Sequence, residues 1–144
     1  MHNRLFSLYN ATLFLVGAFM ILGVFSSHLE AQPGEDPNYQ YPELSDSDFQ
    51  LFIGILDYIN QGRDPKELAR ANNLSDEYAR AVITKIMINT VGKLTGSMDE
   101  MESEYGTGIL FDGSEMILYE KYEEEITAAI VKFDEGGKAD MGGN

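Results

Sequence analysis

The feature that most constrains this chain is a long apolar segment near its N-terminus, which runs from Leu5 to Phe25 and carries no charge. A helix of these 21 residues would be about 30 Å long, the thickness of the hydrocarbon core of a bilayer. The chain has 144 residues in all, so one small domain can follow the segment. We therefore expect residues 1–31 to be a signal peptide or a membrane anchor, separate from that domain.

The apolar segment has two leading interpretations, a cleaved signal peptide and a retained anchor. Arg4 precedes it and acidic residues follow it, which orients the N-terminus inward and the rest of the chain outward. Small Ala31 ends a fitting cleavage site, and the helix-hostile Gln-Pro-Gly that follows favours cleavage. A helix buried in the domain core is disfavoured, because so small a chain has little core to cover it. Both leading interpretations place residues 32–144 outside the cytoplasm, either anchored in the inner membrane or secreted.

The chain has no cysteine, and its two histidines, His2 and His28, flank the apolar segment. Residues 32–144 therefore hold no disulfide, thiol nucleophile, zinc–thiolate site or imidazole base. Small exported eukaryotic domains usually depend on disulfides, so this composition favours the bacterial cell envelope, in the periplasm or another extracytoplasmic space. We expect no catalytic residues, no bound metal and no cofactor.

Residues 32–44 contain three of the four prolines of the chain and predict an extended linker. Tyr39 and Tyr41 lie within this linker. Either they rest on the domain surface where the chain enters it, or they form a docking strip for a protein partner. The second interpretation is reasonable because aromatic side chains give a large contact area at a low entropic cost.

Helix start and stop signals divide residues 45–135 into an all-α bundle of four to five helices. The first four predicted helices run from Ser45 or Asp46 to Gly62, from Pro65 to about Asn72 with Asp64 as the cap, from Ser75 to Gly96, and over Met98–Tyr105 with Ser97 as the cap. The third carries the longest clean amphipathic stripe of the chain, made of Ala79, Val82, Ile83, Ile86, Met87, Val91 and Leu94.

The first helix has more apolar residues than one helix face can hold. Leu51, Ile55 and Tyr58 form a second apolar stripe beside the first. We therefore expect this helix either to be central in the domain or to be covered by a protein partner, and these three residues are candidate partner-binding residues.

Residues 108–119 allow two structures. Asp112-Gly113 between two apolar runs is typical of a hairpin turn. Alternatively, Ser114 caps a last helix, and the Glu, Lys, Met and Ala content of residues 115–132 favours this helix. The glycine-rich residues 136–144 predict a flexible tail.

Residues from Pro65 to Ile86 resemble a helix-turn-helix unit. Asn73 stands in the turn, where glycine is more usual, and Ala69 takes the small position. The apolar positions of the unit are filled by Leu68, Leu74, Ala79 and Val82. The resemblance implies two helices joined by a tight turn. In DNA-binding members the N-terminal end of the second helix contacts base edges.

The residues at that end argue against DNA, because Asp76 and Glu77 would repel phosphates. The polar groups left on the second helix, Arg80, Lys85 and Asn89, are expected to be exposed but are too few for the basic patch that nucleic-acid binding requires. Export would also separate the domain from the genome. Nucleic-acid binding is therefore disfavoured.

The sequence thus predicts an accessory or structural interaction subunit of a larger envelope assembly, bound to a protein partner and also to the membrane if residues 5–25 are retained. The alternative is a membrane-tethered helix-turn-helix regulator that reads DNA or protein through residues 65–94. A weaker alternative is an acidic calcium-binding module, since Glu120 and Glu124 lie one helical turn apart.

Overall fold

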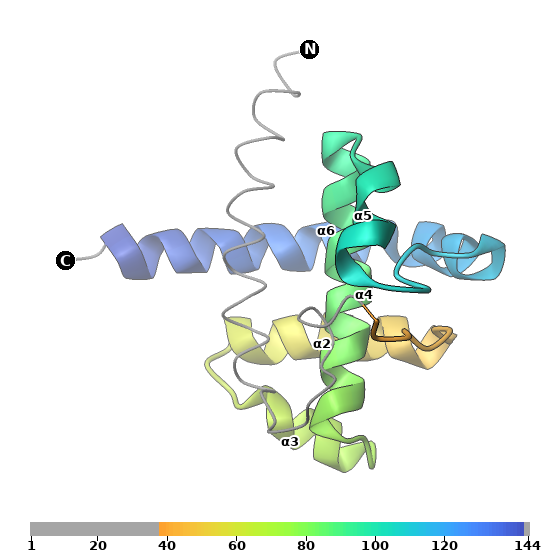
Figure 1. Ribbon diagram of the computed structural model, residues 1–144. Helices are drawn as coiled ribbons and strands as arrows, with labels where there is room; N and C mark the ends of the chain where they lie inside the picture. The colour runs from red at the N-terminus through yellow and green to blue at the C-terminus, as the bar shows by residue number, and fades with distance from the viewer. Residues whose placement is uncertain (1–37, 143–144) are drawn as a thin grey trace.

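The computed structural model describes residues 38–142, with side chains for residues 38–136. This part of the chain is all-α, as predicted, and contains five helices (Figure 1). They are α2 (Asp46–Asn60), α3 (Pro65–Ala71), α4 (Asp76–Thr95), α5 (Met98–Tyr105) and α6 (Gly113–Gly142). The signal peptide or anchor expected in residues 1–31 lies outside the described residues and stays a prediction.

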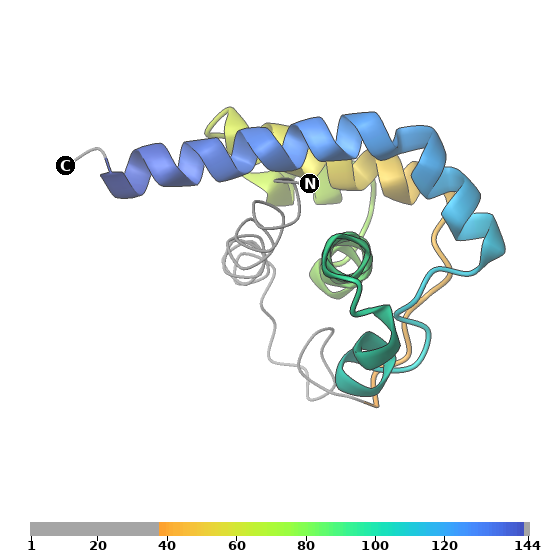
Figure 2. The same cartoon turned by 90° about the horizontal axis from the view of Figure 1, so that it is seen from above.

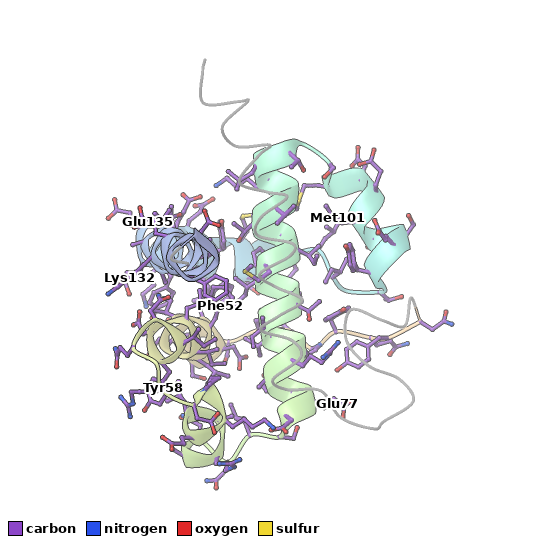
Figure 3. All side chains as sticks on the ribbon, turned by 90° about the vertical axis from the view of Figure 1, so that its left-hand side faces the viewer. Phe52, Tyr58, Glu77, Met101, Lys132 and Glu135 are labelled. Atoms are coloured by element: carbon purple, nitrogen blue, oxygen red, sulfur yellow. The ribbon has the colours of Figure 1, made fainter. Side chains whose placement is uncertain are left out.

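Helix α4 crosses the pair formed by α2 and α6, which lie side by side and run in the same direction (Figures 1 and 2). Helices α3 and α5 pack at opposite ends of α4. The core lies where these elements meet, and Figure 3 shows Phe52 between α2 and α6. The largest fully buried apolar side chains are Phe49, Phe52, Ile55, Leu56, Ile83, Ile86, Met87, Ile109, Ile126 and Ile130. Burying a side chain of this size stabilises the fold by about 1.5–3 kcal/mol.

Local signals in the sequence fix most helix ends. Ser75 accepts the backbone N–H of Tyr78 and caps α4, as predicted. The two glycines that follow α2 and α4, Gly62 and Gly96, have φ angles of 75° and 70°, a left-handed conformation that ends a helix without strain for glycine. The predicted side-chain cap of α5 at Ser97 does not form, because the hydroxyl of Ser97 pairs with that of Thr95 instead.

The last helix begins at Gly113, one residue before its predicted cap, Ser114. Asp112 accepts the backbone N–H of Glu115 at 2.8 Å, and Glu115 accepts the backbone N–H of Asp112 at 2.9 Å. This reciprocal pair is a capping box, so Asp112, and not Ser114, caps α6. The helix alternative for residues 108–119 is thereby confirmed over the hairpin. Helix α6 then continues to Gly142, past residue 136, from which the sequence predicts a tail.

The end of the predicted linker is part of the domain. Tyr41 donates its backbone N–H to the carbonyl of Thr107 at 3.0 Å, and Tyr41 and Leu44 are buried. Gly108 faces this segment with a φ of 80°, and a Cβ there would lie 3.2 Å from the carbonyl oxygen of Tyr41. Residues 39–44 form no helix and pack against the loop before α6.

Candidate functional site

The α3–α4 unit has a tight turn in which Asn73 takes a left-handed φ of 57°. Asparagine tolerates this conformation better than other residues with a side chain, which explains its use where glycine is more common. Leu74 closes the turn by donating its backbone N–H to the carbonyl of Ala69 at 2.9 Å. Asp76 and Glu77 then occupy the first turn of α4, and Figure 3 shows Glu77 at that end of the helix.

The expectation that Arg80, Lys85 and Asn89 are exposed is wrong. Their exposed fractions are 5, 2 and 3 %. The physical reason is that α4 is an internal helix, buried without interruption from Ala79 to Gly92. Side chains at this depth cannot reach a base or a phosphate while the fold is intact, so these three residues do not form a nucleic-acid surface in this structure.

Lys85 and Glu115 instead form a buried ion pair between α4 and the start of α6. The ammonium group lies 2.5 Å from Oε2 of Glu115 and also donates to the carbonyl of Pro42 at 2.9 Å. The same carboxylate accepts the backbone N–H of Leu44 at 2.7 Å. Because burying two charges is costly unless each is paired and hydrogen-bonded, these added contacts are what make the pair tenable. The pair joins α4, α6 and the entering segment 39–44.

Asn89 connects the loop before α6 to α4 by hydrogen bonds. Its side-chain amide donates to the carbonyl of Ile109 at 2.6 Å and to that of Lys85 at 2.7 Å. Its carbonyl oxygen accepts the backbone N–H of Phe111 at 3.0 Å. Every one of these groups is polar and lies in or near the core, so each needs a partner. Asn89 is therefore a packing residue that holds the loop before α6 to α4 by hydrogen bonds.

Asp48 links the starts of α2 and α4. Its carboxylate accepts the backbone N–H of Ser45 at 2.7 Å and the hydroxyl of Tyr78 at 2.9 Å. Burial, together with this hydrogen bond to the Asp48 carboxylate, raises the pKa of Tyr78 to about 12. The hydroxyl of Tyr78 therefore stays protonated at neutral pH and holds the α3–α4 unit against α2.

The candidate partner-binding residues are largely used within the chain. Leu51 and Ile55 are buried, so the second stripe of α2 is explained by the central position of that helix. The guanidinium of Arg63 lies 3.8 Å from the ring centroid of Tyr58 and covers one face of it. Tyr39 and Tyr41 pack edge to face with their centroids 4.8 Å apart, and Tyr39 stays half-buried.

A groove of about 270 Å³ lies between the C-terminal half of α4 and the middle of α6. Its lining residues are Thr90, Lys93, Leu94, Tyr119, Glu123, Thr127 and Ile130. The floor is closed by buried Tyr119 and Ile130, and the Lys93–Glu123 ion pair spans it. The hydrogen bond to the Glu123 carboxylate raises the pKa of Lys93. Sequence patterns did not indicate this groove, because it depends on how α4 crosses α6.

The acidic runs do not converge into a cation site in the described part of the chain. Among those side chains, no group of three or more acidic residues is placed to hold a metal ion. Glu120 and Glu124, the pair considered for calcium, are exposed on α6. Figure 3 shows Lys132 and Glu135 of the same helix pointing away from the body of the domain.

Comparison of the chain with protein-family models, with curated proteins and with solved structures finds no match. None of the helices within residues 38–142 combines the length and the hydropathy that crossing a bilayer requires. The predicted spanning segment, Leu5 to Phe25, lies outside those residues.

Proposed function

We propose that this chain is a non-catalytic interaction subunit of a bacterial envelope assembly, held outside the cytoplasm by the export or anchoring of residues 1–31. The observation that carries the proposal is the open groove between α4 and α6. Leu94, which lines the groove, is 41 % exposed, and Val131, four residues after the lining residue Thr127 on α6, is 43 % exposed. Large apolar side chains beside a preformed groove are a feature of protein-binding surfaces.

The charge of the domain supports a protein partner over a nucleic acid. The chain has 24 acidic and 10 basic residues, a formal net charge of −14. Lys93 and Lys121 are paired with Glu123 and Asp46, while most of the acidic residues of α5 and α6 face solvent. A phosphate backbone would be repelled by this surface, whereas a basic protein surface would be attracted.

A second candidate, a membrane-tethered regulator with a helix-turn-helix-like unit, draws on the shape of α3, its turn and α4. To bind DNA or a protein, this unit would have to use the acidic first turn of α4 or the short exposed face of α3. On α3, Arg70 is exposed and Lys66 lies 4.0 Å from Asp76. We therefore place this candidate second, and as a protein reader before a DNA reader.

A reporter enzyme that is active only outside the cytoplasm, fused after Asn144, tests the location that the proposal requires. We expect the fusion to be active, because Arg4 and the acidic residues after the apolar segment orient the chain outward. The matched control is the same fusion without residues 1–31, which we expect to be inactive. An inactive fusion of the full chain contradicts the proposal and favours the regulator.

A further inference from the structure

The groove between α4 and α6 has one apolar rim on each helix. Leu94 lies on the α4 side and is 41 % exposed although it lines the groove. On α6, Val131 lies one helical turn beyond the lining residue Thr127 and next to Ile130. Leu94 and Val131, together with the buried Tyr119 and Ile130, thus place apolar side chains on both helices at this groove. A surface of this shape accepts the apolar face of a helix.

The charges along the groove are unevenly distributed. Lys93 is the sole cation among the lining residues, and Glu123 neutralises it. On α6, the exposed side chains of Glu120 and Glu124 precede Thr127 at spacings that place all three on one side of the helix. The α6 side of the groove therefore carries apolar Val131 toward the C-terminus and acidic Glu120 and Glu124 toward the N-terminus.

In the Lys93–Glu123 ion pair, a cation from a partner can take the place of Lys93. Both side chains are substantially exposed, at 52 and 40 %, and exposed ion pairs contribute little to stability. A cation from a partner can therefore compete for Glu123 without a large cost to the fold. The pair spans the groove, so its opening would also widen access to the floor formed by Tyr119 and Ile130.

We propose that the groove binds an amphipathic helix whose apolar face is flanked by lysine or arginine. This inference rests on the proposed function and names the chemistry of the partner. The apolar face of the helix packs on Leu94, Ile130 and Val131, and its cations pair with Glu120, Glu123 and Glu124. Acidic amphipathic helices are rejected because like charges would face each other across the contact.

Binding of labelled synthetic peptides to the full chain, measured by fluorescence anisotropy, tests this proposal. The probe is a Leu/Lys amphipathic helix of about 18 residues, or five turns. Its two comparison peptides are a Leu/Glu helix with the same pattern and a Leu/Lys peptide with the same composition in scrambled order. We expect the Leu/Lys helix to bind at least about tenfold more tightly than either comparison peptide. Equal binding of the scrambled peptide would mean simple charge attraction and would overturn the proposal, as would no binding.

Substitutions at the rims locate the binding surface. We expect Leu94→Gln combined with Val131→Gln to weaken binding of the Leu/Lys helix about tenfold, because both apolar contacts are lost. The matched control is Ile117→Gln, which alters an α6 residue that is 69 % exposed and is not among those lining the groove. All three positions are exposed enough that the fold should tolerate the change, and circular dichroism checks this. Equal weakening by Ile117→Gln would overturn the assignment to the groove.

The outcomes separate this inference from the proposed function. An active reporter after Asn144 together with absent peptide binding would reject the groove inference and leave the envelope location intact. An inactive reporter would reject the proposed function, whatever the peptides do.

Discussion

Replacing Glu115 by alanine is expected to lower the free energy of unfolding by about 3–5 kcal/mol, the usual cost of breaking a buried ion pair from one side. The ammonium group of Lys85 would stay buried without its counter-ion, which lies 2.5 Å away in the intact protein. The backbone N–H groups of Leu44 and Asp112 would lose their acceptor as well. Urea unfolding followed by circular dichroism measures the change.

Two further variants make this result specific to the pair. Combining Glu115→Ala with Lys85→Met removes the orphaned charge, so we expect it to restore part of the lost stability. Restoration stays incomplete because the two backbone N–H groups still lack an acceptor. Glu120→Ala, an exposed glutamate on the same helix, should change stability by less than about 0.5 kcal/mol. A loss below about 1 kcal/mol for Glu115→Ala would contradict the role assigned to the pair.

Asn89→Ala is expected to cost about 2–4 kcal/mol, because it leaves the carbonyl of Ile109 and the N–H of Phe111 without their partner inside the domain. Thermal or urea unfolding measures the loss. Exchange of the Phe111 amide hydrogen should also become faster, since the loop before α6 is released from α4.

The comparison variant is Asn72→Ala. Asn72 also donates its side-chain amide to a backbone carbonyl, that of Leu68, but it does so at the surface. We expect a loss of less than about 1 kcal/mol there, because water replaces the hydrogen bond. If the two alanine variants are equally stable, the hydrogen bonds of Asn89 do not hold the loop before α6 to α4. A surface role for Asn89 would then have to be considered again.

Local chemistry made much of the fold predictable. The cap at Ser75, the stops at Gly62 and Gly96, and proline at the start of α3 each act within a few residues of the helix end that they determine. Signals of this range can be read without knowing the tertiary structure. The capping box of α6 was equally local, since Asp112 and Glu115 are three residues apart. Ser114 offers a competing cap in the sequence, so the local pattern alone does not choose Asp112.

The roles of the polar residues on α4 could not be predicted in the same way. A helix with one apolar stripe is expected to face water on its other side, so the sequence predicts that Lys85 and Asn89 lie on the surface. In the structure their partners, Glu115 and Ile109, lie 30 and 20 residues away in the sequence. Only the crossing of α4 over the other elements brings these groups together. The same crossing creates the groove, which no local pattern indicated.

Two other features also depend on packing beyond the local sequence. The second stripe of α2 was ambiguous between a central helix and a partner-covered one, and burial of Leu51 and Ile55 decides for the first. The two glycines Gly136 and Gly137 disfavour helix by about 1 kcal/mol each, so the sequence predicts a tail from residue 136. The helix nevertheless continues through them to Gly142.

Purification of the chain from its native envelope in mild detergent, followed by a mass measurement of the intact particle, tests the central claim most directly. We predict a complex in which this 16.1 kDa chain, or its form cleaved after Ala31, is bound at fixed stoichiometry to another envelope protein. Recovery of the chain as a lone monomer, in a preparation where known envelope complexes stay intact, would contradict the claim that it works as an interaction subunit.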